Sequence, residues 1–63
     1  MTKAHEAIEP LLTIKEVAKI LATSEKTVRR RIENRDLPII RDAGVIRIRP
    51  DDLRSYIARR RDG

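Results

Sequence analysis

Cationic and hydroxyl side chains gather in residues 24–34, at a spacing that could place them on one face of a helix. At about 100° per residue, Val28 and Ile32 would share an inner edge, and the opposite side would carry Lys26, Arg30 and Glu33. Guanidinium groups match phosphate oxygens or the edge of guanine in two-point contacts. This stretch therefore favours the binding of a nucleic acid, and the alternative is a solvated helix face without a ligand.

The start of the same helix offers a second feature that binds anions. Ser24 stands where its hydroxyl oxygen would accept a hydrogen bond from an otherwise unpaired N–H group of the first turn. The remaining free N–H groups would lie beside Lys26 and Thr27. Because free N–H groups at a helix start attract phosphate, this end of the helix is itself a candidate phosphate site.

The cations of the stretch are not equivalent. Arg30 would project straight outward and is the best candidate to read a base, with Lys26 one turn earlier. Arg31 lies closer to the buried edge, so we expect its stem along the core and its head at a phosphate or a carboxylate. The candidate nucleic-acid contacts of this helix are Ser24, Lys26, Thr27, Arg29, Arg30, Arg31 and Asn34.

The distribution of charge supports the same choice of ligand. The chain has 63 residues and a formal net charge of +5. Three lysines and three glutamates cancel in residues 1–22, so the whole excess lies in residues 23–63, with twelve basic and seven acidic side chains. Eleven of those twelve cations are arginines. A surface that only keeps the protein in solution is the simpler explanation of this charge.

Composition excludes several other classes of protein. There is no cysteine, so neither a disulfide nor a thiolate metal site is available, and we expect a reducing, cytoplasmic setting. No apolar run approaches the length that spans a membrane, and residues 1–10 lack the apolar section of a signal peptide. Tyr56 is the only aromatic residue, which disfavours single-stranded RNA because its recognition uses stacked aromatic rings.

Few residues of the sequence are candidates for a catalytic role. His5 is the only histidine and has no evident partner. Asp51 and Asp52 could suggest acid-base or metal chemistry, but stabilisation of a helix start explains the pair better. We therefore expect no catalytic residue, no metal and no cofactor.

The pattern of residues predicts one domain over residues 11–61, between a flexible tail of residues 1–10 and a frayed end of residues 62–63. A first helix should start at Ile14, because Thr13 and Glu16 have the spacing of a reciprocal capping box. Its apolar stripe comprises Ile14, Val17, Ala18 and Leu21.

Ala22 and Thr23 leave room only for a tight turn before Ser24, so the first two helices should form a helix-turn-helix. Pro38 should prevent the second helix from continuing beyond Leu37.

Two short runs then predict a hairpin. Residues 39–41 and 45–49 are separated by a glycine that can adopt the positive φ of a short turn. We expect Ile40, Ile46 and Ile48 to pack downward, and Arg41, Arg47 and Arg49 to face outward as further nucleic-acid contacts. These arginines could instead guard an exposed strand edge against pairing.

A third helix should begin at Pro50, which suits a first helical position. Leu53, Tyr56 and Ile57 would form its inner edge. The cations of residues 59–61 would stabilise its carboxyl end, with backbone contact or partner docking as the less favoured roles.

The order of these elements resembles a small winged helix-turn-helix family that contains phage excisionases and prophage-type regulators, which is similar to the DNA-binding half of MerR-type regulators. Residues 12–21, 24–30, 36–38, 46–48 and 52–53 carry the resemblance. The resemblance implies a mostly α fold with a β-hairpin, in which residues 24–34 lie in the major groove. The hairpin would be a wing on the neighbouring backbone or minor groove.

The resemblance extends to particular residues. Ser24, Thr27 and Arg30 match the serine, threonine and arginine usual in the family's recognition helix. The family usually has glycine where this chain has Ala22 and Arg35, and it tends to have an aromatic residue on the second wing strand.

These expectations give two classes of function. The first is a double-stranded DNA-binding protein, bacterial or phage-encoded, which acts either as an excisionase-like architectural factor with an integrase or as a small transcriptional regulator. Further copies bound side by side on DNA would supply affinity in the former role. The second class is a protein-interaction adaptor with a basic face.

Overall fold

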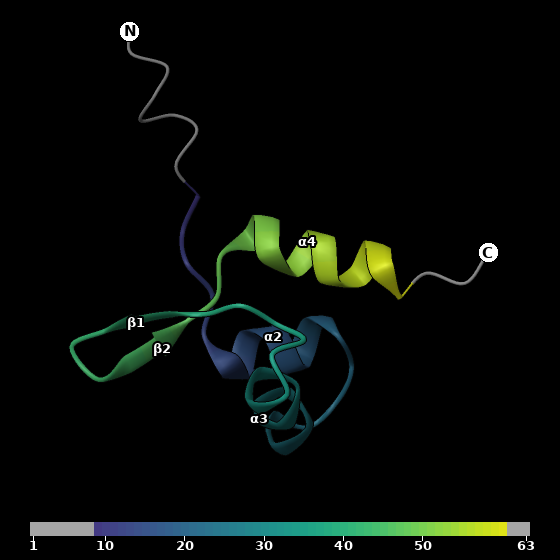
Figure 1. Ribbon diagram of the computed structural model, residues 1–63, viewed down its shortest axis with the longest axis horizontal. Coiled ribbons are helices and arrows are strands. Elements are labelled where there is room, and N and C mark those ends of the chain that lie inside the picture. The colour runs from purple at the N-terminus through teal and green to yellow at the C-terminus, as the bar shows by residue number, and fades with distance from the viewer. Residues whose placement is uncertain (1–8, 61–63) are drawn as a thin grey trace, which may run out of the picture.

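The structure is a computed structural model that describes residues 9–60. In this part of the chain, three helices and one hairpin follow one another: α2 (Ile14–Ile20), α3 (Glu25–Glu33), β1 (Ile40–Asp42), β2 (Val45–Arg47) and α4 (Pro50–Arg59). The architecture is a winged helix-turn-helix, as the sequence predicts (Figure 1). The predictions for His5, Arg61 and residues 62–63, and most of the predicted tail, lie outside the described residues.

Local capping fixes where the first two helices begin. The Thr13 hydroxyl accepts a hydrogen bond from the Glu16 amide at 3.0 Å, and the Glu16 carboxylate accepts one from the Thr13 amide at 2.9 Å. The Ser24 hydroxyl accepts a hydrogen bond from the Thr27 amide at 3.1 Å. The predicted capping box and serine cap are both confirmed.

Left-handed backbone conformations end both helices of the helix-turn-helix. Ala22 follows α2 with φ 56°, and Arg35 follows α3 with φ 64°. At these two positions the family that the sequence resembles usually has glycine. Glycine adopts such angles without a steric penalty. Ala22 and Arg35 therefore each carry the steric cost of a Cβ atom in this conformation.

The core collects one or two residues from each segment around the inner face of α3. Val28 is 1% exposed, and the partly buried Ile32 packs against the same cluster one turn later. This confirms the predicted inner edge of α3. The buried residues are Val17, Ala18, Val28, Leu37, Ile48, Leu53 and Tyr56.

A bridge that the sequence analysis missed joins the start of the domain to the wing. Leu12 and Ile48 exchange two backbone hydrogen bonds of 2.8 Å each, so the segment before α2 lies antiparallel to the end of the hairpin. Ile48 is thereby fully buried, and the wing is attached to the helical body at its base.

The hairpin register corrects one prediction. Asp42 pairs with Val45, so only Ala43 and Gly44 form the turn, with φ 53° and 79°. Positive φ at both central residues is the type I′ geometry that suits twisted two-stranded ribbons.

This two-residue turn places Ile40 opposite Arg47. Because directly paired residues point to the same face of an antiparallel pair, Ile40 lies on the Arg47 face and Arg41 on the Ile46 face. The prediction that Ile40 packs downward with Ile46 and Ile48 is therefore wrong. The prediction that Arg41 faces the same way as Arg47 and Arg49 is wrong for the same reason. Ile39, rather than Ile40, packs against the core.

Helix α4 begins at Pro50 with Asp51 and Asp52 in its first turn, as predicted. Leu53 and Tyr56 are buried, but Ile57 is 40% exposed, so its predicted place on the inner edge is wrong. The Tyr56 ring already covers this side of the core, which leaves Ile57 at the margin.

Two arginines tie the end of α4 to the loop after α3. The Arg59 guanidinium donates to the Asp36 carbonyl oxygen at 2.9 Å, and the Arg60 guanidinium lies 3.2 Å from the Asp36 carboxylate. In the middle of α4, Arg54 pairs with Glu9 at 3.0 Å, and this hydrogen bond raises the pKa of the Arg54 guanidinium above its ordinary value.

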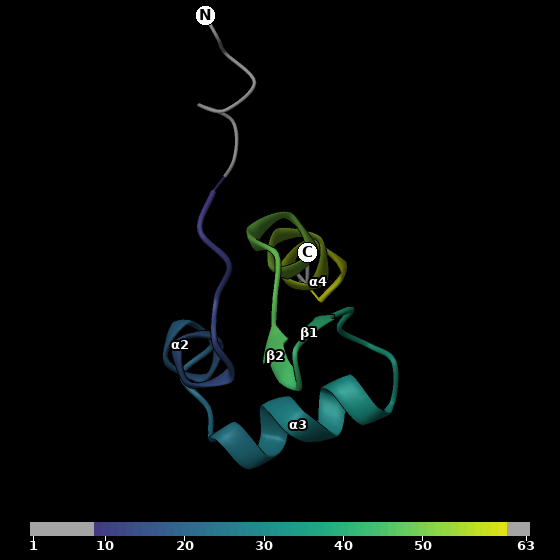
Figure 2. The same cartoon turned by 90° about the vertical axis from the view of Figure 1, so that its left-hand side faces the viewer.

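The elements form three levels. Figures 1 and 2 show α3 at one end of the body and α4 at the other, with the hairpin between them and its turn projecting away from the helices. No helix in residues 9–60 combines the length and the apolar character needed to cross a membrane.

Candidate nucleic-acid interface

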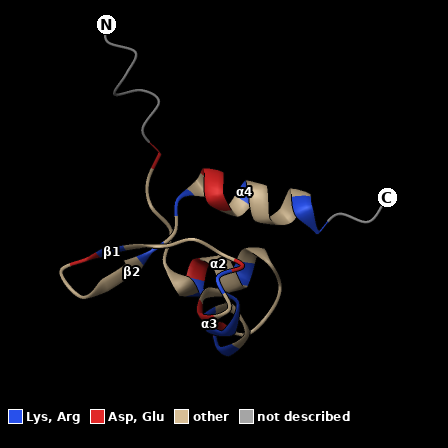
Figure 3. Ribbon diagram, in the orientation of Figure 1, with Lys and Arg blue, Asp and Glu red and all other residues tan. Residues whose placement is uncertain are grey.

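The outward face of α3 carries two cations, Lys26 and Arg30, together with one acidic residue, Glu33. Lys26 and Arg30 are exposed, and neither makes a salt bridge within residues 9–60. The buried Val28 and the partly buried Ile32 hold the opposite side of the helix against the core. Figure 3 shows the resulting concentration of positive charge on α3. This face is available to an anion that enters from outside.

Arg29 lies on the shoulder of this face and is only loosely held. Its guanidinium is 3.8 Å from the Glu25 carboxylate, and both side chains are about half exposed. An exposed pair of this kind contributes little to stability, so Arg29 can exchange Glu25 for a phosphate at small cost.

The start of α3 has free backbone donors. Ser24 satisfies the Thr27 amide, but within the described residues no hydrogen bond engages the amides of Glu25 and Lys26. The Ser24 hydroxyl also donates to the Thr27 hydroxyl at 3.0 Å. Thr27 is half-buried, and its hydroxyl is turned toward Ser24. The free amides of Glu25 and Lys26 match the predicted phosphate site.

Two of the predicted nucleic-acid contacts of α3, Asn34 and Arg31, lie in or next to its last turn. Asn34 is the C-cap residue of α3, and its backbone N–H donates to the Arg30 carbonyl oxygen at 3.0 Å. Arg31 is half-buried as expected, and its Nε is shielded from solvent without a hydrogen-bond partner in the described part of the chain.

The three wing arginines lie in three different environments. Arg41 is exposed, whereas Arg47 is half-buried and donates to the Ile46 carbonyl oxygen at 2.8 Å. Arg49 occupies the N-cap position of α4 without a side-chain cap hydrogen bond, and its guanidinium lies 3.7 Å from the Asp52 carboxylate. The structure therefore separates these cations instead of joining them on one face.

Two grooves beside the wing reveal cations that the sequence analysis did not select. Lys15, Arg29 and Arg47 line a groove of about 390 Å³ between the helix-turn-helix and the hairpin turn. Arg35 and Arg41 line a second groove of about 630 Å³ between the end of α3 and β1. Neither Lys15 nor Arg35 was among the predicted nucleic-acid contacts. Their basic charge was the sole local signal.

Comparison with known families identifies the class of the domain. The pattern of a family described as a helix-turn-helix domain matches residues 11–61, which is most of the chain. The chain belongs to this helix-turn-helix domain family. A search of curated proteins finds no match to it.

Membership assigns a role to the geometry of α2 and α3. In a helix-turn-helix domain the second helix enters the major groove of DNA, and here that helix is α3, with its cations outward. The helix-turn-helix domain therefore implies a DNA-binding protein.

Proposed function

We propose that this helix-turn-helix protein binds double-stranded DNA sequence-specifically through α3 and acts as an excisionase-like architectural factor beside an integrase. The observation that supports the DNA contact is the difference between the two outward cations of α3 and two arginines of α4. Lys26 and Arg30 have no acidic partner in the described residues, whereas Arg54 and Arg60 are paired within the chain.

The remaining contacts follow from the positions of the two grooves. With α3 in the major groove, cations on either side of the wing face the neighbouring backbone. Lys15, Arg29 and Arg47 would contact phosphates on one side, and Arg35 and Arg41 on the other. Arg30 and Lys26 would reach base edges, and the amides at the start of α3 would hold a phosphate.

The architectural role rests on the size of the domain. One module of this kind buries about 600–1,000 Å² on DNA, which is modest for tight binding. Adjacent copies on repeated sites would supply the missing affinity and bend the DNA between them. A small transcriptional regulator is the alternative, and it would need a dimerisation element. Helix α4, which ends at Arg59, is too short to supply an evident coiled coil.

A salt titration tests the DNA contact. If about six phosphates are contacted, the logarithm of the association constant should fall against the logarithm of the salt concentration with a slope near −5. An adaptor that meets only an acidic protein would show little affinity for a duplex at any salt concentration, and that result would contradict the proposal.

Two further measurements separate the architectural role from transcriptional regulation. Circular-permutation gels should reveal bending of a selected DNA site, and sedimentation should give a monomer without DNA and several copies on a long duplex. A stable dimer in solution that leaves the DNA straight would favour the regulator. We also propose that the protein is not an enzyme, so no turnover of DNA should accompany binding.

A further inference from the structure

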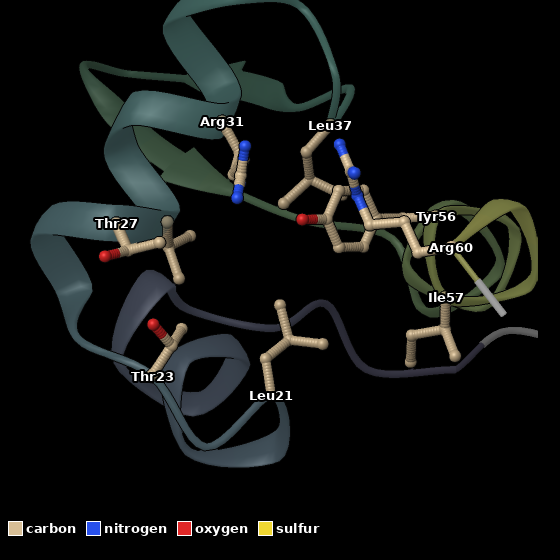
Figure 4. Close-up of a pocket in the computed structure, with 9 residues that line it drawn as sticks. Leu21, Thr23, Thr27, Arg31, Leu37, Tyr56, Ile57 and Arg60 are labelled. Atoms are coloured by element: carbon tan, nitrogen blue, oxygen red, sulfur yellow. The ribbon is translucent and has the colours of Figure 1, made fainter. Parts of the chain in front are cut away.

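A cleft of about 350 Å³ opens between the helix-turn-helix and α4, at the margin where Ile57 emerges from the core. Figure 4 shows side chains from α3 and α4 directed into it. Five of the nine residues that line it are apolar: Leu21, Val28, Leu37, Tyr56 and Ile57. Its volume is at the lower end of the range for ligand sites, which suits one or two side chains and not a whole helix.

The two charged groups of the cleft are both arginines. The Arg60 guanidinium carbon lies 4.6 Å from the centre of the Tyr56 ring, and the same group is held by Asp36. Arg60 thus forms a fixed cationic wall. Arg31 enters from α3 on the other side of Tyr56 (Figure 4).

Arg31 differs from Arg60 because its charge is not compensated. Its Nε is buried without a hydrogen-bond partner, and no acidic side chain among residues 9–60 pairs with it. A buried donor without a partner is costly, and here the guanidinium has lost part of its hydration before any ligand arrives. A carboxylate that reached it would gain a two-point contact with little further desolvation.

We propose that this cleft docks an acidic segment of another protein, which places an aliphatic side chain over Tyr56 and a carboxylate at Arg31. The apolar floor and the uncompensated cation together define that chemistry. A DNA phosphate would supply the charge but carries no aliphatic side chain beside it, because the thymine methyl group of DNA lies at a base edge in the major groove. The cleft includes Thr27 and Arg31, which the sequence analysis listed as nucleic-acid contacts, but not Lys26 or Arg30. With Arg31 assigned to the protein partner, DNA held by Lys26 and Arg30 would leave the cleft open.

A methyl-resolved NMR titration of the full chain tests the docking site. The probe is a synthetic peptide with two central leucines between glutamates, added to protein alone and to protein saturated with a duplex. The methyl groups of Leu21, Leu37 and Ile57 should shift, while those of Ile20 and Leu11 should not. A control peptide with lysines in place of the glutamates should leave all of them unchanged.

Two exposed isoleucines provide matched variants. Ile57 lines the cleft and is 40% exposed, whereas Ile20 is 55% exposed and does not line it. Ile57→Ser should weaken the peptide about five- to tenfold, and Ile20→Ser should change the affinity by less than about twofold. Arg31→Gln should abolish the preference for acidic over neutral peptides, with circular dichroism as the check on folding.

Several outcomes would overturn the docking site. These are an absence of methyl shifts at millimolar peptide, equal binding of the lysine peptide, and equal losses from the two isoleucine variants. Shifts of the same methyl groups with protein concentration alone would assign the cleft to contacts between copies. If a duplex moves the same methyl groups as the peptide and excludes it, the cleft belongs to the DNA contact.

Discussion

Among residues 9–60, three residues other than glycine adopt left-handed backbone angles, and each lies where the chain changes direction. Ala22 ends α2, Arg35 ends α3, and Ala43 forms half of the wing turn. A side chain with Cβ costs about 1–2 kcal/mol in this conformation. In a domain of this size, whose core supplies only a few kcal/mol, each such residue is a substantial fraction of the total stability.

Replacement of Ala22 by glycine should therefore stabilise the fold. Relief of the left-handed strain exceeds the entropy that glycine adds to the unfolded chain, so Ala22→Gly should raise the free energy of unfolding by about 0.5–1 kcal/mol. The urea midpoint should rise with an unchanged slope. The control is Ala58→Gly within α4, which should lower the free energy of unfolding by a similar amount because position 58 is helical. A loss of stability in both variants would contradict this explanation of the turn.

Arg35 should respond differently, because its side chain lines the groove between the end of α3 and β1, together with Arg41 and Glu33. Arg35→Gly should raise the free energy of unfolding by about 0.5–1 kcal/mol and at the same time weaken DNA binding, since one phosphate contact is lost. Denaturation and a duplex titration on the same samples would measure both. Unchanged affinity would show that the arginine is not retained for DNA.

At the scale of the elements, the helices could be predicted and the wing register could not. The helix starts depend on neighbours in sequence, namely Thr13 with Glu16 and Ser24 with Thr27, so a local pattern identifies them. The wing depends on whether its turn has two residues or three. Nothing about Ala43 indicates positive φ, and a shift of one residue exchanges the two faces of a strand.

The wing turn gives the test at this scale. A Cβ added at Gly44 would meet no atom within 4 Å, so Gly44→Ala changes only the conformational energy at φ 79°. The variant should lose about 1 kcal/mol of stability, while Ala43→Asn should gain a few tenths because asparagine tolerates this conformation. Amide exchange in β1 and β2 should change in the same directions. Opposite signs would contradict the two-residue turn.

At the scale of the whole molecule, contacts distant in sequence close the domain. The Leu12–Ile48 bridge and the tie between Asp36 and the end of α4 join segments that no local pattern connects. For the same reason the sequence could identify the cations of α3 as candidate DNA contacts. It could not predict that Lys15 and Arg47 line one groove and that Arg35 and Arg41 line another. It also could not reveal that Ile57 borders a cleft.

Ile48 tests how strongly these contacts support the fold. It is fully buried where the wing meets the segment before α2. Ile48→Ala should cost about 2–5 kcal/mol, which is comparable with the whole stability expected of so small a core. Circular dichroism should show a largely unfolded chain that regains helix when a duplex is added, since DNA binds only the folded state. A fully folded variant without DNA would contradict the assigned core.

In the proposed DNA complex, α3 reads bases with its outward cations because Val28 and Ile32 fix its inner face. The most direct test compares Arg30→Ala and Arg47→Ala on a DNA site selected from a random pool and on an unrelated duplex. Arg30→Ala should cost about 1–3 kcal/mol on the selected site and much less on the unrelated one, whereas Arg47→Ala should weaken both alike. Equal losses on both duplexes from Arg30→Ala would contradict base reading by α3.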